Sequence, residues 1–137
     1  MHIPGSSQII KTNSLSRIYE KGNIKVTALL EVSFEAFEGQ FIGIAGKSGS
    51  GKSTLLNLIG GLDRPTSGNI FFNGHDLTAM NRYDLALHRR LSVGMIFQSF
   101  NLVPTLSALD NVILPLVFSG VNRKSRAAVL LYFPGFA

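Results

Sequence analysis

Apolar and polar residues alternate in part of the first third of the chain, and this period of two predicts a strand there. The alternation is clearest in VSFEAF at 32–37, which is typical of a strand with one solvated face. The dipeptides Gly22-Asn23 and Glu38-Gly39 are expected turns, because glycine accepts the backbone angles that tight turns need. Residues 9–46 are therefore predicted to form several strands, including antiparallel ones.

Two segments are apolar without alternation, which favours strands covered on both faces of a parallel sheet. They are FIGIA at 41–45 and SVGMIFQ at 92–98. Between them, Leu55, Leu58, Ile59 and Leu62 recur at helical spacing, so a helix is expected after the glycine-rich stretch. NIFFNGHD at 69–76 predicts a strand with a turn at residues 73 and 74. Short helices are expected at 83–90 and 105–120, the second interrupted near Pro115.

Composition indicates one globular domain, since 45% of the 137 residues are hydrophobic and 15% are charged. The domain is expected at 9–122, after a loose N-terminus at 1–8 and before an atypical tail at 123–137. The chain has no cysteine, which excludes disulfides and thiolate metal sites. The net charge of +5 could suit a nucleotide, but no basic run carries interleaved aromatics, so nucleic acid is not an expected partner.

The segment GKSGSGKST at 46–54 follows a predicted buried strand and precedes a predicted helix. Its spacing, Gly46-x-x-x-x-Gly51-Lys52-Ser53, is that of a phosphate-binding loop. Glycines let backbone N–H groups converge on phosphate oxygens, and the helix adds the positive end of its dipole. Lys52 can reach the β- and γ-phosphates, Ser53 can offer its hydroxyl to Mg²⁺, and Thr54 can reach the α-phosphate. The predicted nucleotide-binding residues are Gly46, Lys47, Ser48, Gly49, Ser50, Gly51, Lys52, Ser53 and Thr54.

Two longer runs make the chain similar to a known family. GKSGSGKSTLLNLIGGLDRPTSGNI at 46–70 resembles the nucleotide-binding subunit of ATP-binding cassette (ABC) transporters. FQSFNLVPTLSALDNVILPL at 97–116 resembles the subfamily of macrolide-type and lipoprotein-release exporters. The resemblance covers about residues 14–122. It implies an α/β P-loop NTPase fold, N-terminal part only: antiparallel β strands plus a partial parallel sheet with the phosphate-loop helix.

The resemblance also implies roles for single residues. Tyr19 matches the aromatic residue that stacks on adenine, although an ordinary strand tyrosine remains an alternative. Val26 could pack beside the nucleotide or be a plain core valine. Gln98 matches the glutamine that touches Mg²⁺ and the attacking water, the alternative being a glutamine that hydrogen-bonds its own loop. Lys52 and Gln98 are thus the expected catalytic residues, Ser53 and Gln98 the expected metal ligands, and ATP and Mg²⁺ the expected cofactors.

Members of this family work with a transmembrane permease subunit and a second ATP-binding subunit, on the cytoplasmic inner face of the cell membrane. They also carry a Leu-Ser-Gly-Gly-Gln signature, a strand ending in Asp-Glu and a switch histidine, and this sequence has none of the three. We therefore expect a C-terminally truncated ABC-type ATPase that binds ATP weakly and has negligible turnover alone. The alternative is a non-enzymatic, basic fragment that binds a nucleotide or a partner.

Overall fold

The computed structural model describes residues 7–97, 99, 101–118 and 120. The chain divides into two compact units, Met1–Arg89 and Arg90–Ala137. The tail predicted from residue 123 lies outside the described residues. No helix in the described ranges is long and apolar enough to cross a membrane.

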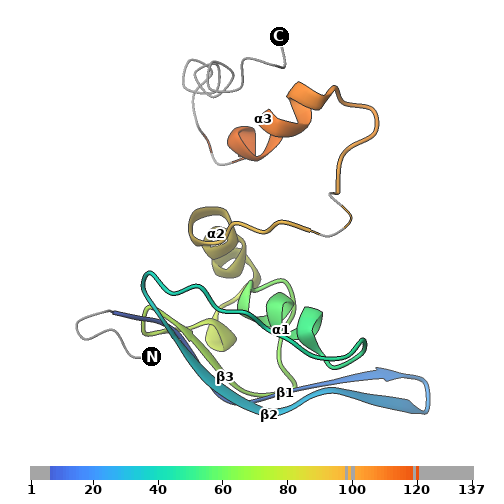
Figure 1. Ribbon diagram of the computed structural model, residues 1–137, viewed down its shortest axis with the longest axis vertical. Coiled ribbons are helices and arrows are strands. Elements are labelled where there is room, and N and C mark those ends of the chain that lie inside the picture. Colours follow the sequence, from blue (N-terminus) through green and yellow to red (C-terminus); the bar gives the residue numbers. More distant parts are fainter. Residues whose placement is uncertain (1–6, 98, 100, 119, 121–137) are drawn as a thin grey trace. The chain divides into compact units, whose positions relative to one another are not determined.

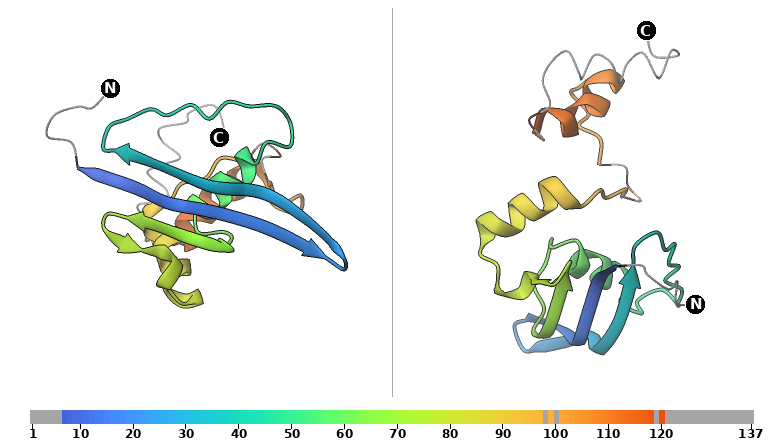
Figure 2. Two further views of the ribbon diagram at one scale, coloured as in Figure 1. Left: turned by 90° about the horizontal axis from the view of Figure 1, so that it is seen from below. Right: turned by 90° about the vertical axis from the view of Figure 1, so that its left-hand side faces the viewer.

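The first unit contains a four-stranded antiparallel sheet with the order β2-β1-β3-β4 (Figure 1). Its strands are β1 Gln8–Lys21, β2 Ile24–Phe37, β3 Ser67–Phe72 and β4 His75–Asp76. Figure 2 shows that the hairpin of β1 and β2 extends well beyond β3. The expected turns at residues 22–23, 38–39 and 73–74 are all present, and the glycine in each has a positive φ.

The hairpin is irregular, and one irregularity positions the functional site. The pairing register shifts between Arg17, which faces Leu29, and Ile18, which faces Thr27. Ala28 is therefore the extra residue of a β-bulge, a feature that bends a strand and re-aims its groups. Beyond the bulge, Tyr19 faces Val26.

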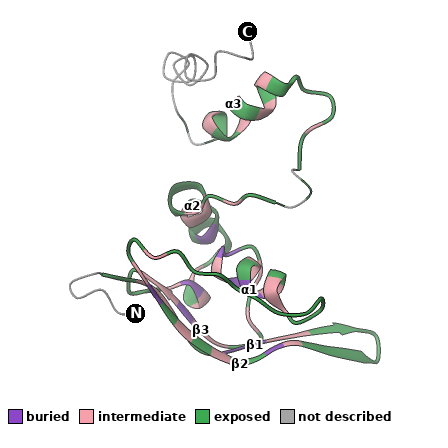
Figure 3. Cartoon of the chain, viewed as in Figure 1, coloured by how far each residue is buried: buried purple, intermediate pink, exposed green. Residues whose placement is uncertain are grey.

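One face of this sheet is covered by α1, Lys52–Ile59 (Figure 1). The 3₁₀ turn η1, Leu77–Ala79, and the helix α2, Arg82–Ser92, follow β4. Buried positions lie on α1, on the sheet and near the start of α2 (Figure 3). The buried cluster consists of Leu15, Leu29, Leu55, Leu58, Ile70, Leu77 and Leu85. Leu55 and Leu58 lie at the helical spacing that the sequence predicts, and both are buried.

The second unit contains α3, Ala108–Phe118. Ser107 precedes this helix, and its hydroxyl accepts a hydrogen bond from the backbone N–H of Asp110, 3.1 Å away, as a helix cap does. The predicted interruption near Pro115 is wrong, because the helix continues past it to Phe118. A proline inside a helix removes one backbone hydrogen bond and can kink the helix without ending it.

The two predicted parallel strands are not formed in the described part of the chain. Residues 40–46 and 93–97 have no strand pairing there. Phe41 and Ile96 are both fully exposed. A strand needs a hydrogen-bonded neighbour, and a parallel strand also needs covered faces. The antiparallel strands and the helix after the glycine loop agree with the prediction, so the difference concerns only the parallel part.

Candidate functional site

Residues 46–51 form a tight loop whose shape depends on glycine at two positions, and residues 52–54 of the predicted loop form the first turn of α1. Gly49 has φ +79° and Gly51 has φ +86°, both in the left-handed region. Side chains rarely adopt such angles, so these positions favour glycine. Gly51 is also the N-cap of α1, and the Leu55 N–H donates to its carbonyl oxygen at 2.9 Å. The loop therefore leads directly into the helix.

Gly51 also brings the loop against the hairpin. A Cβ atom at this position would overlap the carbonyl oxygen of Ala28, and it would lie 2.9 Å from Cδ2 of Leu29. Ala28 is the bulged residue of β2, so the bulge directs a backbone carbonyl at the loop. The two segments can touch only because residue 51 has no side chain. The sheet and the glycine loop therefore form one packed assembly.

The ammonium group of Lys52 points back into the loop. Its Nζ donates to the carbonyl oxygens of Gly46, at 2.8 Å, and Lys47, at 2.7 Å. The Oγ of Ser50 is a third, longer acceptor at 3.4 Å. A positive charge is thus held against the loop by the loop's own carbonyls. The backbone N–H of Ser50 donates to the carbonyl oxygen of Lys47 at 3.2 Å, which closes a turn inside the loop.

The N-terminus of α1 is suited to an anion. The first four N–H groups of a helix have no partner within the helix, and the dipole places positive charge there. Gly51 has no side chain to cap these groups, and the first turn of α1 has no acidic residue. Ser53 lies in this turn and is exposed. Its hydroxyl is a hard oxygen of the kind that Mg²⁺ prefers.

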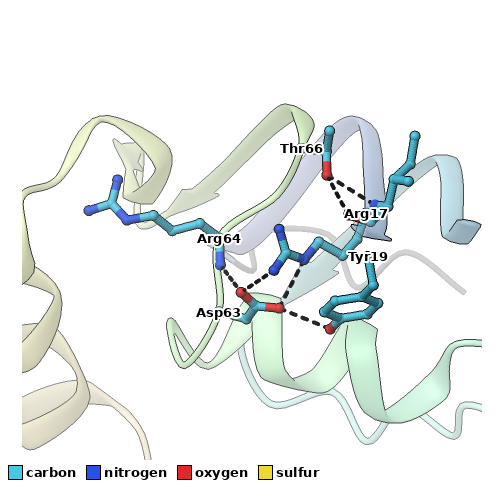
Figure 4. Close-up of polar contacts among 6 residues, drawn as sticks. Arg17, Tyr19, Asp63, Arg64 and Thr66 are labelled. Carbon is cyan, nitrogen blue, oxygen red and sulfur yellow. Dashed lines mark hydrogen bonds and ion pairs between the residues drawn. The ribbon is translucent and has the colours of Figure 1, made fainter. Parts of the chain in front are cut away.

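Tyr19 and Val26 lie side by side on the hairpin, since they are cross-strand partners. Tyr19 is 39% exposed and Val26 is 55% exposed, so Val26 is not a core valine. The Tyr19 hydroxyl donates to Oδ2 of Asp63 at 2.9 Å, and the Arg17 guanidinium carbon lies 4.5 Å from the centre of the Tyr19 ring (Figure 4). The sequence analysis did not identify Asp63 or Arg17 as neighbours of Tyr19. The available signal was the i, i+2 spacing of Arg17 and Tyr19, which places them on one face of a strand.

Gln98, the other expected catalytic residue, lies outside the described residues. The structure thus brings together the loop 46–54, α1 and the hairpin that carries Tyr19, and it leaves the role of Gln98 as a prediction. The roles of Tyr19, Val26 and the loop residues toward a nucleotide likewise remain predictions.

Two groups elsewhere in the first unit have displaced pKa values. Burial acts to raise the pKa of Asp76, but hydrogen bonds from Thr78, Asn69 and the backbone of Ala79 outweigh it, and the net pKa is lowered. Burial, followed by the charge of Arg89, lowers the pKa of His88. His88 is not a surface or turn residue. It is half-buried on α2, and its ring packs edge-on against Phe72 with centroids 4.7 Å apart.

Comparison with known proteins gives consistent matches. The family model described as "ABC transporter" matches residues 29–133. An uncharacterized ABC transporter ATP-binding protein of Thermotoga maritima is 49% identical over 122 residues, which are 87% of this chain and 52% of that protein. A macrolide export ATP-binding/permease protein, MacB, of Marinobacter nauticus is 40% identical over 126 residues, which are 90% of this chain and 20% of that protein.

The similar solved structures are also ATP-binding cassettes. A dimeric ATP-binding cassette in a post-hydrolysis state, bound to ADP and Pi, is similar with a TM-score of 0.80 and 39% identity. The match covers 86% of this chain and 52% of that one. A dimeric bacterial ABC transporter cassette is similar with a TM-score of 0.81 and 40% identity. The chain therefore spans about half the length of the ATP-binding proteins that it matches.

Proposed function

Because this chain belongs to the ABC transporter family, we propose that it is the ATP-binding part of a membrane exporter and holds Mg·ATP in the loop 46–54. The observation that carries the proposal is the Lys52 ammonium, held 2.7–2.8 Å from two loop carbonyls. Those carbonyls are neutral acceptors. A terminal phosphate carries charge and forms stronger, charge-assisted hydrogen bonds, so it can replace them.

The loop and the first turn of α1 would share the phosphate oxygens. Lys52 would supply a point charge to the β- and γ-phosphates, and the backbone N–H groups would supply a fixed dipole. Residues 47–50 would contribute mainly through their backbone, while Thr54 would reach the α-phosphate. Phosphoryl transfer depends largely on such positioning and charge stabilisation.

Mg²⁺ fits the residues at the helix start. The exposed Ser53 hydroxyl would hold the ion from the protein side, and Gln98 is the second proposed ligand. The ion would neutralise charge on the β- and γ-phosphates. Tyr19 and Val26 would form the wall of the base site, because they lie together on the exposed hairpin.

The names of the relatives suggest the wider setting. One relative is a macrolide export protein that joins ATP-binding and permease functions, and the similar solved cassettes are dimers. We therefore propose a transmembrane permease and a second ATP-binding subunit as partners, on the cytoplasmic face of the membrane.

Thermal unfolding with and without nucleotide tests the phosphate site. A ligand present at 100 times its dissociation constant stabilises the folded state by about 2.7 kcal/mol, so saturating Mg·ATP should raise the melting temperature measurably. Mg·AMP, which lacks the β- and γ-phosphates, should raise it much less. Lys52→Ala should remove most of the ATP effect. Lys47→Ala is the matched control, because it removes an equal charge from the same loop and keeps the carbonyl that Lys52 contacts. If Mg·ATP raised the melting temperatures of Lys52→Ala and Lys47→Ala by the same amount, the proposal would be contradicted.

We further propose that this 137-residue chain turns over ATP negligibly by itself. No glutamate follows Glu38 in the sequence, so the loop has no later glutamate in this chain to orient an attacking water. Phosphate release should stay at the level of a chain-free control. Steady hydrolysis that Lys52→Ala abolishes would show that this is wrong.

A further inference from the structure

We propose that Asp63 and Arg17 are positioning residues that fix the Tyr19 ring as the platform for adenine. This inference rests on the proposed ATP-binding function and deepens it, because it identifies what holds the base site. Neither residue would touch the phosphates. Both act through the tyrosine, Asp63 on its hydroxyl and Arg17 on one face of its ring (Figure 4).

The three side chains form a closed set of contacts. The Arg17 Nε donates to Oδ2 of Asp63 at 3.0 Å, and the other end of the guanidinium donates to Oδ1 at 2.9 Å. This is a bidentate ion pair, which fixes direction as well as distance. Oδ2 also accepts the Tyr19 hydroxyl at 2.9 Å, while the guanidinium lies over the Tyr19 ring. The ring is therefore constrained both at its hydroxyl and on one face.

Asp63 is itself held in place by backbone contacts. Its N–H donates to the carbonyl oxygen of Asn57 on α1 at 3.3 Å, and its Oδ1 accepts the Arg64 N–H at 2.7 Å. The segment then returns to β1, where the Thr66 hydroxyl accepts the N–H of Ile18 at 3.0 Å. The Thr66 N–H donates to the carbonyl oxygen of Ser16 at 2.8 Å. These bonds to β1 lie on both sides of Arg17, so the carboxylate and the guanidinium cannot move apart easily.

Burial makes the ion pair more than a surface contact. The side chains of Arg17 and Asp63 are 24% and 27% exposed, so solvent screens them only partly. Tyr19 is more exposed, at 39%. Because Arg17 covers one face of the ring, we assign the opposite face to the base. Aromatic rings stack on nucleic-acid bases in this way. A ring that is already oriented loses less entropy when the base binds.

The test compares Mg·ATP with Mg·tripolyphosphate, which has phosphates but no base, on the full 137-residue chain. Tyr19→Phe keeps the ring and removes the hydroxyl that binds Asp63. Asp63→Asn removes the negative charge that pairs with the Arg17 guanidinium. Each should weaken ATP binding about three- to tenfold and leave tripolyphosphate binding within about twofold, because the effect reaches only the base. Tyr83→Phe and Asp84→Asn are matched controls at exposed positions of α2, and both ligands should bind them as before.

Arg17→Met is a third test variant, which removes the guanidinium and keeps an unbranched side chain. If the guanidinium supports the ring from behind, this change weakens ATP binding in the same selective way. Tighter ATP binding by Arg17→Met would mean that Arg17 occupies the face the base needs, and it would overturn the inference. Unchanged ATP binding by both Tyr19→Phe and Asp63→Asn would also overturn it, as would equal weakening of both ligands, which indicates a general loss of structure.

The outcomes for the unmodified chain separate this inference from the proposed function. If the chain binds neither ligand, or if Lys52→Ala changes neither, the phosphate site is wrong and this inference falls with it. If Lys52→Ala weakens both ligands while Tyr19→Phe and Asp63→Asn change nothing, the phosphate site stands and the positioning role alone is refuted.

Discussion

Gly51→Ala is the substitution whose cost the structure defines best. The backbone at this position has φ +86°, and placing a non-glycine residue in the left-handed region costs about 1–2 kcal/mol. The added Cβ would also overlap the Ala28 carbonyl and lie 2.9 Å from the Leu29 side chain. Inserting a carbon into a packed contact costs about 1–3 kcal/mol more. We therefore expect a total loss of about 2–5 kcal/mol in the free energy of unfolding.

Two other glycines separate the two parts of this cost. Gly49 has φ +79° but nothing within 4 Å of its Cβ position, so Gly49→Ala should show the backbone cost alone, about 1–2 kcal/mol. Gly43 lies outside the positive-φ region and also has nothing within 4 Å, so Gly43→Ala should cost almost nothing. Urea unfolding followed by circular dichroism measures all three changes. At about 4 °C per kcal/mol, Gly51→Ala should lower the melting temperature by roughly 8–20 °C. Equal losses for Gly51→Ala and Gly49→Ala would refute the close-contact argument.

Three further predictions concern the first unit. Leu58→Ala, at a position 1% exposed, should cost about 2–4 kcal/mol in urea unfolding, whereas Leu56→Ala on the same helix, 50% exposed, should cost far less. Asp76→Ala should lower the free energy of unfolding by about 1 kcal/mol at neutral pH, because the carboxylate caps η1 by accepting the Thr78 N–H at 2.8 Å. The difference in stability between this variant and the unmodified chain should shrink as the pH falls below 4, because a carboxyl with a lowered pKa loses its stabilising effect there. The lowered pKa of His88 means that folding favours the neutral ring, so its contribution to stability is complete above pH 6.5 and is lost as the pH falls from there toward the folded-state pKa. His88→Phe should make the melting temperature depend less on pH across that range, while a His75→Asn control should not. If the dependence of the melting temperature on pH were unchanged in His88→Phe, the reasoning would be contradicted.

The sequence predicted the family, the turns and the helix that follows the glycine loop well. The resemblance to ABC nucleotide-binding subunits of the macrolide-export type is confirmed by the family match and by the 49% and 40% identical relatives. The P-loop NTPase fold, N-terminal part, is confirmed by the similar solved cassettes. Turns and α1 were predictable because they depend on nearby residues: glycines at positive φ, and leucines at helical spacing.

Features that depend on distant residues were not predictable in the same way. The segments 41–45 and 93–97 have the composition of buried strands, but a strand forms only where a neighbour offers hydrogen bonds, and local composition does not specify that neighbour. The contact of Asp63 with Tyr19 joins residues 44 positions apart, and nothing near either residue indicates it. The β-bulge at Ala28 likewise appears only from the pairing of two strands.

The placement of α1 has a consequence for how the two ends of the proposed nucleotide site are connected. The helix begins at the glycine loop and, 8 residues later, leads into the segment that contains Asp63. An α-helix rises about 1.5 Å per residue and resists stretching, so about 12 Å of rigid backbone separates its two ends. If the loop holds phosphates and Asp63 orients Tyr19 as proposed, these two points are joined by a rigid connection, and neither can shift along the helix axis without the other.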